Sequence, residues 1–366
     1  MKVLHVVSIS FSLTYFIGDQ FEYFKNKGVS FFVACSDSDH LNNYAKKMHF
    51  QVFPVPIVRS INVVQDLKSI WKLYNYIRKE KFDIVIAHTP KGGLVGMASA
   101  FLARTQSRIY FRHGLVFETM SGWHKTMMIS IEKLVSFFAN EIVNVSNSIL
   151  NEAVKLKLNP PEKNILLGKG TCNGVDINRF CPSPEKSNLD KIVVGFVGRL
   201  GKDKGIIELI QAWEILKLTY KEISLLLIGP MDERDLLPAE IIQFIKSEDS
   251  IEYVGEVEDA SMYYRKMDIF ILPSYREGFP TVVLEASASG IPVITTKNTG
   301  CIDSIIQDVT GVFTPIDSSS IAEKISYYIT NENLRKAHGE NGRRFIVENF
   351  SQDVFYKEVE KSIYKL

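Results

Sequence analysis

The chain has 366 residues, a length that favours two domains of ordinary size. Hydrophobic residues make up 46% and charged residues 23%, which is typical of a globular protein and excludes a disordered one. The formal net charge of +1 provides no overall field that would favour nucleic acid as a partner. The four cysteines are scattered, which argues against a disulfide framework or a zinc site and fits a reducing compartment.

Two uncharged stretches bear on membrane insertion. Residues 3–18 lack Asp, Glu, Lys and Arg, but serines interrupt the apolar run and no small-x-small cleavage site follows. Residues 92–103 are too few to span a bilayer, which takes ~20 residues. We therefore expect a cytoplasmic protein that contacts a membrane at most peripherally.

The first half of the chain alternates apolar runs with helical patterns. The expected strands are 3–10, 29–36, 52–57, 82–88, 109–112, 141–145 and 165–167, and the expected helices are 16–26, 62–81 and 92–103. The helix over 62–81 is amphipathic, with Leu67, Ile70, Trp71, Tyr74 and Ile77 at helical spacing. This alternation predicts an α/β domain, a doubly wound parallel sheet with helices on both faces.

The same pattern restarts at Ile192. The expected strands are 192–197, 223–228, 251–254, 269–272 and 292–295, and the expected helices are 205–218, 239–246, 260–265 and 280–289. Ser320 to Glu323 has the spacing of a capping box for a further helix. The turn-rich segment 181–188 separates the halves, so we expect domains over 1–186 and 187–350.

One stretch of the second domain combines a strand, a tight loop and a helix. The apolar run 268–272 precedes the loop, a helical pattern follows Pro280, and Gly290 and Pro292 stop it. The free backbone N–H groups at such a helix start bind phosphate. Glu277 and Glu285 flank this point, and carboxylates accept hydrogen bonds from hydroxyls. A sugar nucleotide, with hydroxyls on both sides of its phosphates, fits this pattern.

A second loop carries two cations. Residues 198–205 follow the first strand of the second domain and contain Arg199 and Lys204, without the spacing of a Walker A motif. Taken alone, these cations are either solvated loop charges or ligands of a diphosphate.

Glu277 and Glu285, within Glu-Gly-Phe-Pro-x4-Glu, resemble the donor-site signature of retaining GT-B glycosyltransferases of family 4. The resemblance implies two Rossmann-like domains facing a central cleft, with residues 351–366 packing back on the first domain. It also implies that Arg199 and Lys204 hold the donor diphosphate, that Glu277 contacts the donor sugar and that Glu285 contacts the ribose. The backbone N–H groups expected to hold the phosphates belong to Gly278, Phe279, Thr281 and Val282.

Two histidines end expected strands of the first domain. The resemblance implies that His113, followed by Gly114, hydrogen-bonds a sugar hydroxyl near the reaction centre; a structural histidine is the alternative. For His88, contact with the acceptor and a structural role are equally open. No motif surrounds His5, His40, His49 or His338.

Two positions depart from the family pattern, and one further motif is typical of a different glycosyltransferase fold. The loop 8–14 lacks the usual Gly-Gly pair, and hydroxyls such as those of Ser10 and Ser12 would have to replace it. Asp303 stands where relatives usually carry Glu. Asp37 and Asp39 form an Asp-x-Asp, which is either a metal site or a turn; we expect a turn, no metal in the chemistry and no cofactor. The motif 173–176, Asn-Gly-Val-Asp, has an expected structural role.

The segment 123–138 begins with Trp123, contains Lys125 and Lys133, and is either a core-packed helix or a helix at a membrane interface. Similar bacterial enzymes extend sugars on polyprenyl-diphosphate carriers at the inner face of the plasma membrane, which favours the interfacial role.

We therefore expect a retaining glycosyltransferase that moves a hexose or N-acetylhexosamine from a nucleotide sugar, most simply a UDP-sugar, to a hydroxyl of a polyprenyl-diphosphate-linked glycan during surface polysaccharide biosynthesis. The implied mechanism is front-face attack, in which the leaving diphosphate helps to take the acceptor proton. The alternatives are a GT-B nucleotide-sugar epimerase and a catalytically silent sugar-nucleotide binding subunit. The combination of Arg199, Lys204, Glu277 and Glu285 favours the transferase.

Overall fold

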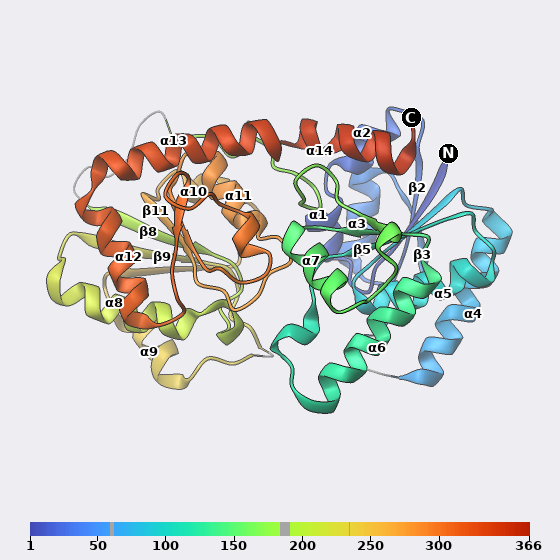
Figure 1. The fold of residues 1–366 in the computed structure, drawn as a ribbon, viewed down its shortest axis with the longest axis horizontal. Helices are drawn as coiled ribbons and strands as arrows, with labels where there is room; N and C mark the ends of the chain where they lie inside the picture. The colour runs from blue at the N-terminus through green and yellow to red at the C-terminus, as the bar shows by residue number, and fades with distance from the viewer. Residues whose placement is uncertain (59–61, 184–190, 234) are drawn as a thin grey trace. The chain divides into compact units, whose positions relative to one another are not determined.

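The structure is a computed structural model that describes residues 1–58, 62–183, 191–233 and 235–366. The chain forms two compact units, Met1–Asn173 together with Glu358–Leu366, and Gly174–Lys357. Each unit contains a parallel sheet, and in Figure 1 the first unit is coloured from blue to green except for the red end of the chain, which also belongs to it.

The first unit is built on a seven-stranded parallel sheet in the order β3-β2-β1-β4-β5-β6-β7. The strands are β1 Lys2–Val6, β2 Ser30–Cys35, β3 Gln51–Pro54, β4 Ile84–His88, β5 Ser107–Arg112, β6 Glu141–Asn144 and β7 Asn164–Ile165. The strand order reverses between β1 and β4, which pair in parallel. Ligands of doubly wound sheets bind at the carboxyl ends of the strands at such a reversal, so the loops after β1 and β4 lie where a site is expected.

Helices connect these strands. They are α1 Ser12–Phe16, α2 Gln20–Lys25, α3 Asp39–Met48, α4 Val63–Glu80, α5 Pro90–Leu102, α6 Gly122–Phe138 and α7 Asn147–Lys155. The core of this unit lies between the sheet and α4, α5 and α6, where Leu4, Val85, Val95 and Val135 are fully buried. Within the described residues, no helix is both long enough and apolar enough to cross a membrane.

The end of the chain returns to the first unit. It comprises α14, Gln352–Val359, and a π-helical turn, Glu360–Tyr364. Glu360 pairs with Lys27 at 2.5 Å, and the ring of Tyr364 meets that of Phe24 edge-on, with 4.7 Å between their centroids. The transfer begins at Glu358, whereas residues 351–357, which we expected in the first domain, belong to the second unit. Ser351 and Gln352 remain there because they bond with Val175.

The second unit has a six-stranded sheet in the order β10-β9-β8-β11-β12-β13. Its strands are β8 Ile192–Val197, β9 Ile223–Ile228, β10 Ile251–Gly255, β11 Ile269–Leu272, β12 Val293–Thr295 and β13 Gly311–Phe313. Its helices are α8 Ile206–Thr219, α9 Ala239–Ser247, α10 Ser261–Tyr264, α11 Thr281–Ala288, α12 Ser318–Thr330 and α13 Glu332–Asn349. The expected α/β doubly wound class is confirmed for both units.

The boundary between the units lies after Asn173, not at the expected residue 186. Val175 donates its backbone N–H to Phe350, and Arg343 donates to the backbone carbonyl of Phe180. These bonds tie 175–180 to the second unit. The turn-rich segment expected to separate the domains, 181–188, lies largely outside the described residues.

Several local expectations were wrong for identifiable reasons. The expected helix over 16–26 is interrupted at Gly18, which has φ +52° and where a Cβ would lie 2.4 Å from the Asn173 side chain. The helix α12 is capped by Asp317, which accepts from Ser320 N–H at 2.8 Å, so Ser320–Glu323 is not its capping box.

The helix expected over 62–81 is α4, and its apolar residues divide between the core and the surface. Leu67 and Trp71 are 61% and 65% exposed, while Leu73 and Ile77 are buried. Val63 and Val64 are exposed beside them. The helix therefore has two apolar sides, one in the core and one on the surface.

Candidate functional site

Three loops of the second unit meet at the carboxyl ends of neighbouring strands. They follow β8, β9 and β11, and β8 lies between the other two strands in the sheet. Gly205, at the end of the β8 loop, has φ +70°, and a Cβ there would lie 2.2 Å from the carbonyl oxygen of Pro273 in the β11 loop. Only glycine fits this contact, so it holds the two loops against each other.

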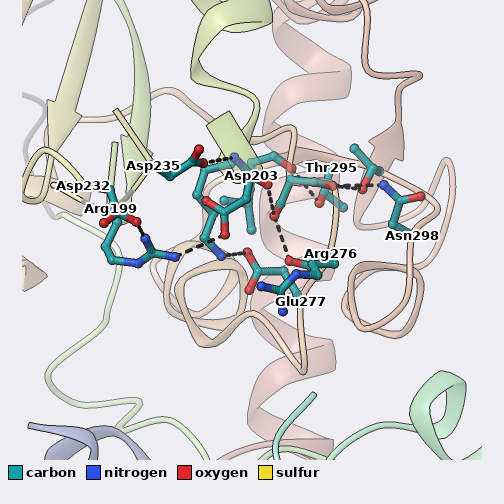
Figure 2. Close-up of polar contacts among 12 residues, drawn as sticks. Arg199, Asp203, Asp232, Asp235, Arg276, Glu277, Thr295 and Asn298 are labelled. Carbon is teal, nitrogen blue, oxygen red and sulfur yellow. Dashed lines mark hydrogen bonds and ion pairs between the residues drawn. The ribbon is translucent and has the colours of Figure 1, made fainter. Parts of the chain in front are cut away.

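Arg199 lies in the loop after β8 between two carboxylates. One guanidinium nitrogen pairs with Asp232 from the β9 loop, and another lies 3.2 Å from Asp203 (Figure 2). Asp203 is itself fixed through its backbone N–H, which donates to Asp235 at 2.9 Å. Arg199 is 37% exposed although both carboxylates hold it, so its position is defined while one side stays accessible.

Lys204 and Glu277 form a second ion pair. The Lys204 ammonium lies 2.5 Å from Oε1 of Glu277, and both side chains are largely buried. The structure thus brings together the cation expected at the diphosphate and the carboxylate expected at the sugar. At this separation the carboxylate orients the ammonium, because a buried charge is stable only with a partner.

The loop from Gly278 leads into α11, whose N-cap residue, Pro280, provides no side-chain hydrogen bond. The N–H groups of Val283 and Leu284 bond to the carbonyl of Pro280, which leaves those of Thr281 and Val282 without a partner inside the helix. The Phe279 side chain is buried and lies against Phe350, with 5.3 Å between the rings. Its expected contribution to a phosphate site is therefore limited to its backbone.

Glu285 lies one turn into α11, on the same side as Thr281. The Tyr264 hydroxyl donates to its Oε2 at 2.8 Å. The residue is partly exposed, but desolvation of its carboxyl by the surrounding protein raises its pKa from 4.5 to about 6, against the opposing effects of Tyr264 and Arg179. The carboxyl is therefore ionised above about pH 6, where it can accept hydrogen bonds from a ligand hydroxyl.

Arg276 precedes Glu277 in the same loop and was overlooked in the sequence. Its backbone carbonyl accepts from Ser274 at 3.0 Å, while its Nε is buried without a hydrogen-bond partner in the described part of the chain. Unlike Arg199 and Lys204, it forms no ion pair with the residues that the structure describes. A cation directly beside a predicted ligand-binding carboxylate was the signal that could have indicated it.

In the first unit, His113 directly follows β5. Its Nε2 lies 2.9 Å from Nδ1 of His88, and its ring stacks on Phe16 with 3.6 Å between the centroids. Burial lowers the pKa of His113 to about 3, so the ring is neutral at physiological pH. His5 in β1 is linked to His88 in turn, at 3.0 Å, a contact that nothing in the sequence indicated.

Ser10, expected to replace the family's glycine contact, is buried and lies with its hydroxyl 2.9 Å from that of Ser38. Ser38 is the N-cap of α3 and accepts from Leu41 N–H, and Asp39 is the first residue of that helix. The side chain of Asp37 accepts from Asn42 at 3.2 Å. The Asp-x-Asp therefore forms a helix start, and no group of three or more potential metal ligands occurs among the described residues.

Comparison with known proteins places this architecture in a family. The family model described as glycosyl transferases group 1 matches residues 180–345, and the one described as glycosyl transferase 4-like matches residues 2–147. The chain is 33% identical to CapM, a capsular polysaccharide biosynthesis glycosyltransferase of Staphylococcus aureus, over 98% of this chain and 96% of that protein. This chain belongs to glycosyltransferase family 4. It is an enzyme of the glycosyltransferase type, as expected.

Further relatives agree with this assignment. The family 4 chain is 24% identical to an Escherichia coli UDP-Gal:alpha-D-GlcNAc-diphosphoundecaprenol alpha-1,3-galactosyltransferase, over 91% of this chain and 88% of that protein. The crystal structure of Anabaena HepE in complex with UDP matches it with a TM-score of 0.82 and 20% identity, over the whole of both chains. The expected GT-B fold is confirmed, and the matches give no support to the epimerase or the silent subunit.

Proposed function

We propose that this family 4 enzyme is a retaining glycosyltransferase that moves a hexose or N-acetylhexosamine from a UDP-sugar to a hydroxyl of a polyprenyl-diphosphate-linked glycan. The observation that carries the proposal is the pairing of Lys204 with Glu277 at the start of α11. Relatives support the finer points: CapM is named for capsular polysaccharide, and the Escherichia coli enzyme for a diphosphoundecaprenol acceptor. HepE has been crystallised with UDP and with UDP-glucose.

The donor roles follow from the side chains at the carboxyl edge of the second sheet. Lys204 and Arg199 face the diphosphate, assisted by the N–H groups of the loop from Gly278 to Val282. Each charge-assisted hydrogen bond contributes about 1.5–3 kcal/mol. Glu277 accepts from sugar hydroxyls, and Glu285 accepts from the ribose.

The reaction breaks the bond between the anomeric carbon and the diphosphate oxygen and forms a bond to the acceptor oxygen on the same face. The acceptor proton passes to the departing diphosphate, whose growing negative charge makes it the base. Lys204 and Arg199 stabilise that charge more strongly in the transition state than in the bound donor, which is the requirement for catalysis. This scheme needs no metal and no cofactor.

We further propose peripheral contact with the inner face of the plasma membrane through α6. Trp123 and Phe137 are 66% and 64% exposed, and Leu134 is exposed on the same side of the helix, since 11 residues make about three turns. Lys133 adds a positive charge beside this side of α6. Exposed aromatic and aliphatic residues next to lysines are typical of helices that lie in a lipid interface.

The test of the donor assignment is calorimetric titration with UDP, GDP, ADP and dTDP in the absence of metal. We expect selective binding of UDP, followed by transfer from UDP-sugars to polyprenyl-diphosphate-linked glycans. Selective binding of GDP would replace the donor class, and failure to bind any of the four would contradict the proposed donor site.

A further inference from the structure

Three histidines from adjacent strands of the first unit form a hydrogen-bonded chain. His5 lies in β1, His88 ends β4 and His113 follows β5, and these strands are neighbours in the sheet. Nδ1 of His5 lies 3.0 Å from Nε2 of His88, and Nδ1 of His88 lies 2.9 Å from Nε2 of His113. His5 and His88 are buried, whereas His113 is partly exposed. The chain therefore links the interior of the sheet to its surface.

All three rings are neutral. Burial lowers the pKa values of His5 and His113 to about 3 and that of His88 far below its usual range. The rings in contact with His5 are those of Phe21, Phe31 and His88. A neutral imidazole carries one N–H and one lone pair, so both hydrogen bonds of the chain must point in the same direction.

The inner end of the chain determines that direction. Nε2 of His5 is buried without a hydrogen-bond partner within the described residues. If His113 donated inward, Nε2 of His5 would carry a buried, unpaired N–H, which is rare in proteins and costs about 1–3 kcal/mol. If His5 donates outward, Nε2 carries only a lone pair, which is tolerated more often. The outward direction leaves Nε2 of His113 as an acceptor and places the proton on its Nδ1.

The backbone beside His88 is also fixed. Thr89 has φ +66° and ψ 154°, a conformation that costs a β-branched residue of order 1–3 kcal/mol. Its hydroxyl lies 3.1 Å from that of Ser8 and accepts from Gly92 N–H. Such strain persists only where the surrounding structure holds it, so the end of β4, and with it the ring of His88, has one defined position.

We propose that His5 and His88 are positioning residues that hold His113 as the Nδ1–H tautomer, so that His113 presents a hydrogen-bond donor to an oxygen of the sugar substrate. This inference rests on the proposed transferase function. It defines the role of His113: the only lone pair of its neutral ring is used by His88, so the ring donates to the substrate and does not take the acceptor proton. That is consistent with the leaving diphosphate as the base.

The tautomer is measurable directly. In protein labelled with 15N-histidine, long-range 1H–15N correlation distinguishes protonated from unprotonated ring nitrogens, and the His113→Asn variant assigns its signals among the seven histidines. We expect Nδ1 of His113 to be protonated and Nε2 to be unprotonated. The opposite assignment would overturn the proposal, whatever the enzyme transfers.

Enzyme kinetics test whether His88 positions His113 for the reaction. An asparagine places its amide nitrogen near the position of Nδ1, so His88→Asn keeps the donor to His113 and His88→Leu removes it. We expect His88→Leu to lower kcat about 10-fold with little change in the affinity for UDP, and His88→Asn to remain within about threefold of the wild type. His40→Leu, at an exposed histidine, is the matched control.

The outcomes separate the two proposals. Equal kcat values for His88→Leu and His88→Asn would refute the positioning role while leaving the donor site intact. Wild-type protein that binds no nucleoside diphosphate would refute the donor site, and the tautomer measurement would still decide the histidine chain.

A second inference has independent support in the charges of the β11 loop. Arg199 is paired with Asp203 and Asp232, and Lys204 with Glu277, so the cations expected at the diphosphate are both matched by carboxylates. The Arg276 guanidinium has no such partner among the described residues, and its Nε is buried and unsatisfied. Figure 2 shows it on the same loop as Glu277. We infer that Arg276 binds a diphosphate group, either of the donor or of the lipid-linked acceptor.

The variant Arg276→Gln distinguishes these sources. A rise of about 10-fold or more in the dissociation constant of UDP assigns the donor diphosphate, and a similar rise in KM for the lipid-linked acceptor with unchanged UDP affinity assigns the acceptor. Arg276→Lys should recover part of either loss. Lys246→Gln removes an exposed charge on α9, away from the β8 and β11 loops, and is the control. Unchanged values for both ligands would overturn the inference.

Discussion

Replacement of Glu285 by Gln tests the donor site through stability and binding together. The carboxyl of Glu285 accepts from Tyr264 at 2.8 Å, and desolvation raises its pKa from 4.5 to about 6. Glutamine has nearly the same shape and keeps an oxygen that accepts from Tyr264, but it does not ionise. Any difference between the two proteins in how the free energy of unfolding varies with pH therefore reports the cost of ionising Glu285 in the folded state.

The direction in which stability changes with pH follows from the raised pKa of Glu285. The folded protein binds the proton on Glu285 more tightly than the unfolded chain, so this group stabilises the fold fully below pH 4.5, and the contribution is lost as pH rises through about 6. The rise in the pKa of Glu285 from 4.5 to about 6 corresponds to about 2 kcal/mol of stability. The free energy of unfolding of Glu285→Gln, relative to the wild type, should therefore rise by about 2 kcal/mol between pH 4 and pH 8.

Binding should change in the opposite direction. The ionised carboxylate accepts two hydroxyl hydrogen bonds from a ribose, whereas glutamine offers one acceptor oxygen. The loss of a hydrogen bond to a charged group, about 1.5–3 kcal/mol, predicts UDP affinity lower by about 10- to 150-fold at pH 8.

Urea unfolding followed at several pH values, together with calorimetric titration of UDP, measures both effects. A stability difference that does not vary with pH would refute the burial argument. Unchanged UDP affinity in the variant would refute the ribose contact, even if the stability result agreed.

Three further predictions concern the remaining proposals. Lys204→Ala should lower kcat by about 100- to 1,000-fold without loss of secondary structure, because the leaving diphosphate loses its cation. Near-normal turnover would contradict that role, and Lys246→Ala on α9 provides a surface control. Sugar transfer, measured before and after chelation with EDTA, should be unchanged. Loss of transfer on chelation, with recovery on adding a divalent cation, would support a metal role for Asp37 and Asp39. The double variant Trp123→Ala and Phe137→Ala should sediment with phosphatidylglycerol vesicles at least fivefold less than the wild type, while UDP binding is unchanged. Equal sedimentation of the two proteins would contradict the interfacial role of α6.

The strand, loop and helix around Glu277 were predictable because the local signals agree. A buried apolar run marks β11, Pro280 marks the start of α11, and Gly290 with Pro292 follows its end. Thr281 and Glu285 are four residues apart, a spacing that places both on one side of α11. Such features depend on neighbours within a few residues, which is the range over which helical and strand periodicity carries information.

Contacts between distant segments were not predictable in this way. The pairing of Lys204 with Glu277 depends on the approach of two loops, which Gly205 and Pro273 determine in three dimensions. The bond between His5 and His88 depends on β1 and β4 being neighbours in the sheet although 83 residues separate the two rings in sequence. A single sequence shows the residues in each case but not the register that brings them together.

The exposed side of α4 shows a different limit of prediction from hydrophobic periodicity. Periodicity identified an amphipathic helix, but periodicity cannot distinguish an apolar side that faces a core from one that faces solvent. Trp71 was grouped with Ile77, which is buried, yet Trp71 is exposed. The same ambiguity applies to α6, where the sequence did not show whether Trp123 is buried or exposed.

The two units differ in the charge state of the residues proposed to act, and this difference has a mechanistic consequence. In the second unit the residues are ionised cations and carboxylates, as binding and release of a diphosphate require. In the first unit His113 belongs to a neutral chain whose rings have pKa values depressed by burial. A protonatable histidine would compete with the leaving diphosphate for the acceptor proton, whereas a neutral donor orients the sugar without taking part in the proton transfer. Burial of His5 and His88 therefore favours the scheme in which the product diphosphate, not the protein, removes the proton.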